Sequence, residues 1–294
     1  MGSILGTLAC LPAAATFRPE YKDAMQYKHL TPQEAEQLAQ TLGAPLFATS
    51  LHMPVYQEGV VGKWKMARTG FCLDRGYFSD LWAVFGMPVL LRNHGETGER
   101  WETWMSLSPH EIESQELGCR YAFGHAVVMG LGMGWVAVNM ALNPKVFMVS
   151  VIERDPEVIE LFHHSRAMDG LPVSARNKIR IILADALEWR PDKPVDFLYA
   201  DIWRCLEEPQ TVDEVRCMQS NVLADQIYYW GQELTISALA GNIPRSGSEW
   251  SNAVRRCVAE KIALPLLIPD ELDYPQMIAT VARQRRERFP GRGA

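Results

Sequence analysis

Short apolar runs alternate with helix-compatible segments in the middle of the chain. Runs of this kind are typical of parallel strands in a sheet that helices cover on both faces. The pattern predicts a doubly wound, mostly parallel, Rossmann-like α/β sheet. Its five strands are expected at residues 126–129, 146–152, 178–183, 196–200 and 226–230.

The residues before this region follow a different pattern. Thr31-Pro32-Gln33-Glu34 is a capping box, which predicts a helix that ends near Gly43. Residues 89–92 and 101–105 are extended runs on either side of turn-forming residues, and they predict a hairpin. Ser108-Pro109 begins a further helix that leads into the first core strand.

The residues after Gly231 become helical, as in 248–263, and several prolines interrupt them. This arrangement predicts three parts. Residues 1–107 form a partly β N-terminal lid or substrate region, 108–244 a cofactor-binding core, and 245–294 a helical C-terminal extension.

A Gly-x-Gly-x-Gly turn, Gly130 to Gly134 with Gly132 between them, follows the first predicted core strand. Glycine has no Cβ, so such a turn can adopt positive φ and bring backbone N–H groups close to a ligand. The second predicted strand ends on Glu153, where a carboxylate can accept hydrogen bonds from both hydroxyls of a ribose. The sequence therefore predicts a cofactor that contains adenosine.

Two more acidic positions follow predicted strands. Asp185-Ala186 comes after the third strand, and Asp201 comes after the fourth. With the glycines and Glu153, they resemble the class I S-adenosylmethionine-dependent methyltransferases, in the spermidine-synthase-like branch. The resemblance covers roughly residues 108–231.

The resemblance implies S-adenosyl-L-methionine as the cofactor. It places Gly130, Gly132 and Gly134 beside the methionine moiety and Glu153 at the ribose. Asp185 would bind the adenine amino group, with Ala186 and Leu187 flanking the ring. Gln115 and Ser114, which precede the first core strand, could contact the cofactor carboxylate or the substrate.

A methyl group on a sulfonium is already a strong electrophile, so the protein mainly has to hold a nucleophile in line and close to it. A carboxylate can take the proton from an amine or hydroxyl nucleophile. We predict that Asp201 is this catalytic base, with Tyr199 and Glu233 as further candidates. Trp135 or Trp203 could provide an aromatic wall for the cationic sulfur.

Two features depart from the family pattern. No antiparallel hairpin of strands six and seven is recognisable after Gly231. Ala200-Asp201-Ile202-Trp203 also lacks the Asn/Asp-Pro-Pro-aromatic motif of enzymes that methylate amino groups on bases or glutamine. We therefore expect methylation of a small molecule, and no nucleic-acid substrate.

Three other functions are compatible with the motifs. Aminopropyl transfer, aminocarboxypropyl transfer or an intramolecular cyclisation would use the same cofactor and release methylthioadenosine, although aminopropyl transfer in the family uses an additional Asp-rich motif. Gly132-x-Gly134-x-x-Ala137 also fits a loose nicotinamide-dinucleotide fingerprint, but no second mononucleotide-binding half is recognisable. A non-catalytic scaffold with this fold is the last alternative.

Composition narrows the expected partners. The net charge of -6 argues against a large nucleic-acid surface.

The six cysteines are far apart in the sequence, which favours reduced thiols in a cytoplasmic protein and no metal site. No apolar run is long enough to span a membrane, and residues 1–10 lack the basic start of a signal peptide. A homodimer is possible.

Several polar residues are expected to have no role in the site. Glu111, Glu113 and Glu116 would form a stripe on the helix after Ser108, which we interpret as a solvated face. His110 and His125 have no partner recognisable in the sequence, and we expect neither to be catalytic or to bind a metal.

Overall fold

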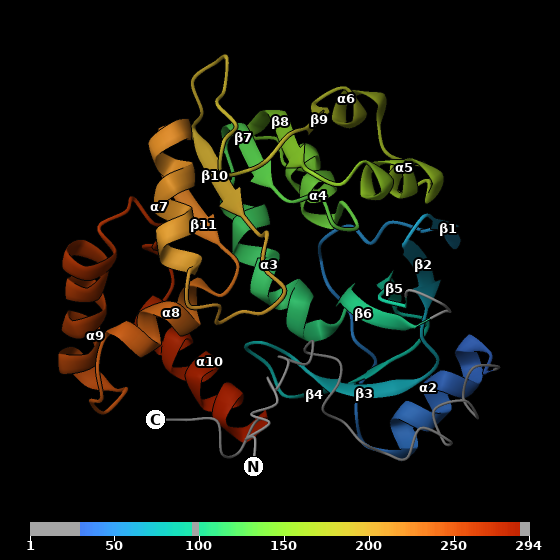
Figure 1. The fold of residues 1–294 in the computed structure, drawn as a ribbon. Helices are drawn as coiled ribbons and strands as arrows, with labels where there is room; N and C mark the ends of the chain where they lie inside the picture. The colour runs from blue at the N-terminus through green and yellow to red at the C-terminus, as the bar shows by residue number, and fades with distance from the viewer. Residues whose placement is uncertain (1–29, 96–99, 289–294) are drawn as a thin grey trace, which may run out of the picture.

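The computed structural model describes residues 30–95 and 100–288, with a five-stranded parallel sheet at the centre (Figure 1). The strand order is β11-β10-β7-β8-β9. After β9 the chain crosses to the other side of β7, where it adds β10 and then β11. The predicted Rossmann-like α/β fold is therefore confirmed, and each predicted strand lies within two residues of its observed bounds. The strands are β7 (Gly124–Met129), β8 (Val146–Glu153), β9 (Ile179–Leu183), β10 (Phe197–Ala200) and β11 (Gln226–Tyr229).

Helices connect these strands, and their caps follow the sequence signals. Ser108 accepts a hydrogen bond from the amide of Glu111 at the start of the helix before β7, and Asp155 caps the helix after β8. Both helices have proline in the first turn, where its missing N–H is not needed. The helices are α3 (Pro109–Tyr121), α4 (Trp135–Leu142), α5 (Pro156–His164), α6 (Val173–Arg176), α7 (Thr211–Val222) and α8 (Gln232–Leu239).

The register of the parallel strands aligns their carboxyl ends. Met129, the last residue of β7, is paired with Ala200 of β10 on one side and with Ile152 of β8 on the other. Glu153 is paired with Leu183, the last residue of β9. The residues that follow these strands therefore emerge at one edge of the sheet, which is where open α/β sheets bind ligands.

The N-terminal part is built on antiparallel strands and lies beside α5. The predicted capping box at Thr31 is present, and the predicted hairpin is formed by β5 and β6. The tip of this hairpin, 96–99, and the segment 1–10 considered above lie outside the described residues. The elements are α2 (Pro32–Thr41), a sheet of β1 (Gly59–Val61), β2 (Trp64–Arg68), β5 (Pro88–Asn93) and β6 (Trp101–Ser106), and a pair of β3 (Cys72–Arg75) and β4 (Leu81–Val84).

The C-terminal part is helical, as predicted. It contains α9 (Gly247–Arg256), the π-helix η2 (Cys257–Ile262) and α10 (Tyr274–Arg288). Between η2 and α10, the amide of Ile227 in β11 donates to Pro265 and its carbonyl accepts from Leu267. A single parallel bridge thus lies beside β11, and no antiparallel hairpin follows that strand in the described part of the chain.

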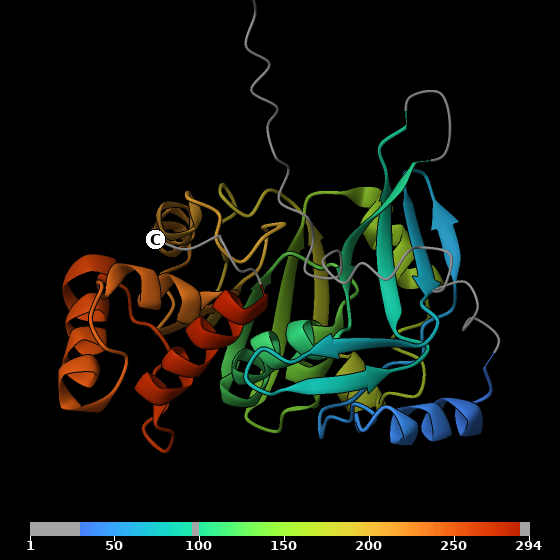
Figure 2. The same ribbon diagram turned by 90° about the horizontal axis from the view of Figure 1, so that it is seen from below.

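The two outer parts flank the core on opposite sides (Figure 2), and they contact each other through α10 and β3. Arg288 of α10 forms an ion pair with Asp74 of β3 at 2.7 Å. The buried carboxylate of Glu233, in α8, accepts hydrogen bonds from Tyr77, Tyr228 and Tyr274 at 3.1, 3.1 and 2.8 Å. These tyrosines come from the N-terminal part, β11 and α10, so one carboxylate joins all three parts of the chain.

No helix within residues 30–95 and 100–288 has both the length and the apolarity needed to cross a bilayer. Among the same residues, no group of three or more His, Cys, Asp or Glu side chains is arranged to hold a metal ion.

Candidate active site

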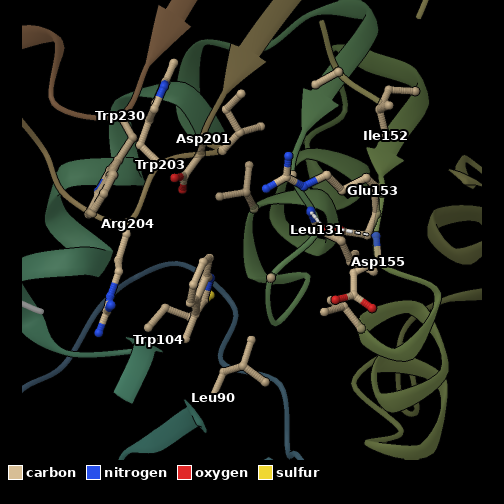
Figure 3. A pocket seen from close by; sticks show the side chains of 18 of the residues that line it. Leu90, Trp104, Leu131, Ile152, Glu153, Asp155, Asp201, Trp203, Arg204 and Trp230 are labelled. Carbon is tan, nitrogen blue, oxygen red and sulfur yellow. Dashed lines mark hydrogen bonds between the residues drawn. The ribbon is translucent and has the colours of Figure 1, made fainter. Parts of the chain in front are cut away.

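A cavity of about 610 Å³ lies at the carboxyl edge of the five-stranded sheet (Figure 3). Its size is within the range of small-molecule sites. Residues from the N-terminal sheet, including Trp64, Leu90 and Trp104, form the wall opposite the strand ends. Eight of the nine site residues predicted from the sequence line it: Gln115, Gly130, Gly132, Glu153, Asp185, Ala186, Tyr199 and Asp201.

Glu153 is held by the backbone on both sides of its strand end. One carboxylate oxygen accepts from the amide of Leu131 at 3.0 Å, and the other accepts from the amide of Asp155 at 2.8 Å. The carboxylate therefore links the glycine turn to the start of α5. This fixed orientation leaves the remaining lone pairs of a half-buried carboxylate available at the cavity wall.

Gly130 allows the ends of β7 and β10 to lie close together. Its φ is +96°, and a Cβ at this position would lie 2.1 Å from the backbone oxygen of Asp201. No side chain fits in that space, because the clashing atom belongs to the backbone. At Gly132, with φ +51°, a Cβ would meet the sulfur of Met105 at 2.5 Å, so a side chain of β6 covers the turn.

Gly134 is the predicted site residue that is not in the cavity lining. It begins α4 with φ +74°, and a Cβ there would lie 2.1 Å from the ring of Phe162. The expected cofactor contact is thus not supported by its position. The third glycine instead lets α4 pack closely against α5.

Asp185 both caps a turn and lines the cavity. Its carboxylate accepts from the amide of Leu187 at 2.9 Å, and its carbonyl accepts from the amide of Trp189 at 2.9 Å, so it caps a short turn. The same residue, with Ala186, lines the cavity. Capping orders the loop after β9 and holds both residues at the wall.

Asp201 lies at the end of β10, in the half of the cavity opposite Glu153 (Figure 3). The hydroxyl of Tyr199 donates to its carboxylate at 3.3 Å. Burial raises the pKa of Asp201 to about 7, and the hydrogen bond from Tyr199 opposes this rise. Asp201 can therefore accept or release a proton near neutral pH, as a general base does.

Glu111 is a site residue that the sequence analysis missed. The prediction of a solvated face for Glu111 and Glu113 is wrong, because only 5% and 9% of these residues are exposed. Glu111 accepts from the amide of Ser106 at 2.7 Å and lines the cavity. Its pKa is raised well above the ordinary value, mainly by burial, and the charge of Asp201 adds to the effect.

Glu113 instead binds the N-terminal part, accepting from the amides of Phe78 and Ser79. In the sequence, Glu111 and Glu113 could not be told from Glu116, which does form an ion pair with Arg120 near the surface. The fold alone decides which of the three faces the cavity.

Two further candidates, Glu233 and Ser114, and one residue expected to have no role in the site, His110, also have clear positions. Glu233, considered as a base, is absent from the cavity lining and is occupied by its three tyrosines. Ser114 also lies outside the lining, and its hydroxyl accepts from the indole of Trp230 at 2.8 Å. His110 is buried, and burial holds its pKa well below the ordinary value.

Tryptophans form much of the acceptor half of the cavity, which we define as the part around Asp201. The indole N–H groups of Trp203 and Trp230 donate to Glu214 and Ser114, so their hydrogen-bonding capacity is already used. Trp135 also lines the cavity, and its buried indole N–H has no partner among the described residues.

No protein-family model matches the chain, and no curated protein matches it. Among solved structures, it is similar to the glycopeptide N-methyltransferase MtfA in complex with S-adenosyl-L-homocysteine, with 17% identity, coverage of 38% of this chain and 42% of that chain, and a TM-score of 0.30. For precorrin 8w decarboxylase of Methanobacterium thermoautotrophicum, the identity is 21%, the coverage 37% and 53%, and the TM-score 0.28. For the 23S rRNA methyltransferase ErmE, the identity is 16%, the coverage is 40% of this chain and 42% of that chain, and the TM-score is 0.29. The chain spans about half the length of these proteins or less, and similarity at this level transfers no function to it.

The packing role of Gly134 can be separated from its backbone conformation. Gly170 also has positive φ, +83°, but a Cβ at this position would have no atom within 4 Å. We expect Gly170→Ala to lower the free energy of unfolding by about 1 kcal/mol, the cost of left-handed backbone. Gly134→Ala should cost about 1–3 kcal/mol more, because the methyl group overlaps Phe162. Urea unfolding measures both, and equal losses would contradict the packing role.

Proposed function

We propose that the protein is an S-adenosylmethionine-dependent methyltransferase that acts on a small molecule. The supporting observation is the composition of one cavity. The glycine turn, Glu153 and Asp185 lie at the ends of β7, β8 and β9, respectively. Asp201, with its raised pKa, lies at the end of β10. An adenosine-binding half and a proton-accepting half therefore share one space.

The residues present fit this cofactor. Glu153 would accept from the ribose hydroxyls, and Asp185 with Ala186 would contact the adenine. Gly130, Gly132 and Gln115 would lie near the methionine moiety. When bound, S-adenosylmethionine supplies an electrophilic methyl group on a sulfonium.

The chain's own residues have the remaining tasks. Asp201, ionised, takes the proton of the acceptor nucleophile, and Tyr199 orients the carboxylate through its hydrogen bond. The faces of Trp203 and Trp230 exclude water around the base. Trp104 and Met105 of β6 bring the N-terminal sheet against the cavity, which favours a small acceptor over a polymer.

The first test concerns the cofactor half. Glu153→Ala should weaken S-adenosylhomocysteine binding about a hundredfold or more, since two hydrogen bonds to a charged acceptor are lost. Isothermal titration calorimetry measures this affinity, and Glu160→Ala, an exposed position on α5, is the matched control. Loss of the two backbone contacts of Glu153 should also lower stability by about 2 kcal/mol, which urea unfolding reports separately. Unchanged affinity would show that the cofactor is misplaced.

The second test concerns the base. The rate of S-adenosylhomocysteine release, with a small-molecule extract as the source of acceptor, should rise about tenfold per pH unit below pH 7 and level off above it, because Asp201 must be ionised. Asp201→Asn should lower the rate about 10²–10⁴-fold, remove this pH dependence and spare S-adenosylhomocysteine affinity. Release of methylthioadenosine instead would contradict methyl transfer.

The pKa of Asp201 has a separate effect on stability. A carboxyl whose folded-state pKa is raised disfavours ionisation, so its contribution is intact at low pH and is lost as pH rises from about 4 to about 7. Asp201→Asn should therefore gain stability relative to the natural chain as pH rises from about 4 to about 7, and the difference should stay constant above pH 7.

A further inference from the structure

Two arginines lie close to the ring of one tryptophan at the cavity wall. The guanidinium of Arg92, in β5, lies 5.1 Å from the ring centroid of Trp104 and 5.4 Å from that of Trp64. The guanidinium of Arg204, in the loop after β10, lies 6.0 Å from the ring of Trp104. All four residues line the cavity. Stacking on aromatic rings holds a guanidinium in place and leaves its edge donors free for hydrogen bonds.

The donors of these two arginines are largely unused. Arg92 has no hydrogen bond or ion pair with any described residue, apart from its two ring contacts. Arg204 donates through Nη2 to Glu102 at 3.2 Å, and its Nη1 makes no hydrogen bond with any described residue. A guanidinium carries five donors and no acceptor, so a ligand for these groups must supply acceptor oxygens.

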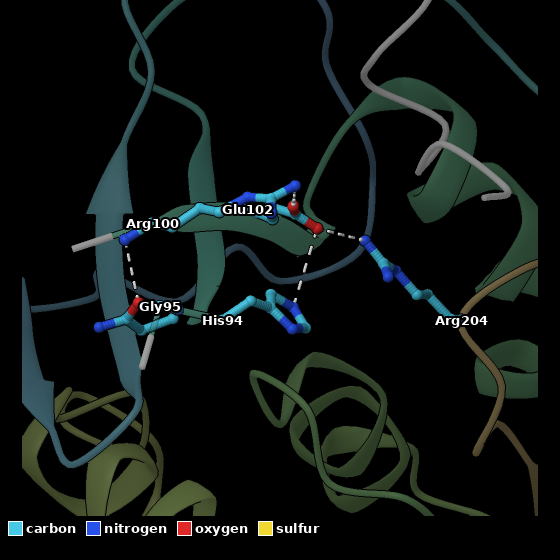
Figure 4. Close-up of polar contacts among 6 residues, drawn as sticks. His94, Gly95, Arg100, Glu102 and Arg204 are labelled. Atoms are coloured by element: carbon cyan, nitrogen blue, oxygen red, sulfur yellow. Dashed lines mark hydrogen bonds and ion pairs between the residues drawn. The ribbon is translucent and has the colours of Figure 1, made fainter. Parts of the chain in front are cut away.

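The acidic residues nearby do not supply acceptor oxygens for all the donors of Arg92 and Arg204. Glu102 divides its carboxylate among Arg204, Arg100 and His94, at 3.2, 2.9 and 3.8 Å (Figure 4). Asp155, across the cavity, is occupied by Lys63 at 3.0 Å and by the indole of Trp64 at 2.9 Å. Figure 3 shows Arg204 extending away from Asp201 and beside Trp104. Arg204 thus points away from the proposed base.

We propose that Arg92 and Arg204 bind an oxyanion of the acceptor, so that the substrate is a small molecule with a carboxylate or phosphate group. Planar guanidinium groups match both oxyanions through paired hydrogen bonds. The inference rests on the proposed function, because it assigns the nucleophile of the same acceptor to Asp201. The acid group then lies against Trp104 while the nucleophile reaches the carboxyl edge of β10.

The test uses full-length protein saturated with S-adenosylhomocysteine. Isothermal titration calorimetry compares phenyl phosphate and 3-phenylpropionate with the neutral 3-phenylpropan-1-ol. At least one acid should bind about tenfold or more tightly than the alcohol, and whichever acid binds better identifies phosphate or carboxylate as the group. Equal binding of acids and alcohol, or no binding of either acid, would overturn the proposal.

Variants assign the binding to the arginines. Arg92→Gln and Arg204→Gln should each weaken the preferred acid about tenfold, and the Lys variants should lose less because they keep the charge. Arg100→Gln is the matched control, because Arg100 contacts the same Glu102 but is 74% exposed and does not line the cavity. Equal losses in all three Gln variants would overturn the assignment.

Glu102→Gln distinguishes ligand binding by Arg204 from a purely structural role of that residue. Removing the carboxylate frees Arg204, so the preferred acid should bind about twofold to fivefold more tightly. Unchanged or weaker binding would contradict competition between Glu102 and the ligand.

The binding of S-adenosylhomocysteine separates this inference from the proposed function. If the natural chain binds S-adenosylhomocysteine but neither acid, the inference fails and the proposed function stands. If it does not bind S-adenosylhomocysteine, the proposed function fails. If Arg92→Gln and Arg204→Gln lose S-adenosylhomocysteine as well as the acid, the arginines bind the cofactor carboxylate, and the inference is wrong.

Discussion

The contact between Gly130 and the backbone oxygen of Asp201 is the constraint on which the site depends. Parallel strands place their carboxyl ends at one edge, but the ends of β7 and β10 can meet only if the residue between them has no side chain. That close contact brings the glycine turn and the acidic residue after β10 into one cavity. Glu153 then fixes the turn from the other side through the amide of Leu131. The two halves of the site are thus positioned by backbone contacts, which are less adjustable than contacts between side chains.

Burial gives the cavity its chemical character and has an energetic cost. Asp201 and Glu111 are both placed where burial disfavours ionisation, and the charge of Asp201 makes Glu111 still harder to ionise. A protein selected for stability alone would neutralise such positions, because buried carboxylates without cationic partners destabilise the fold. Strain of this kind is expected at functional sites, where reactivity is gained at the expense of stability. The compensating rigidity comes from fully satisfied groups elsewhere, such as Glu233 with its three tyrosines.

The sequence predicted the core well because its signals are local. Apolar runs, caps at Ser108 and Asp155, and glycines after the first strand each depend on near neighbours in the chain. The acceptor half depends on contacts between distant segments, and these carry no local signal. Glu111 is buried in α3, which packs against β3, and it accepts from Ser106 at the end of β6. Arg92 reaches Trp104 through the pairing of β5 with β6. The pairing of Arg92 with both Trp64 and Glu102 across the sheet could have been noticed once the strand order was known. At Gly134 the structure shows a packing role that the motif did not indicate, because a Cβ there would overlap Phe162.

The parallel bridge beside β11 has a consequence for the solubility of the chain. Exposed sheet edges present unpaired N–H and C=O groups that can recruit a strand from another molecule. At the β11 edge, Pro265 and Leu267 occupy the backbone groups of Ile227, and the proline has no N–H to offer a further strand. The opposite edge, β9, is only five residues long and exposes the charge of Arg180. The segment that links η2 to α10 thus covers part of the β11 edge, where a strand of a second molecule could otherwise pair. A substitution that displaced this segment would expose that edge as well as disturb the fold.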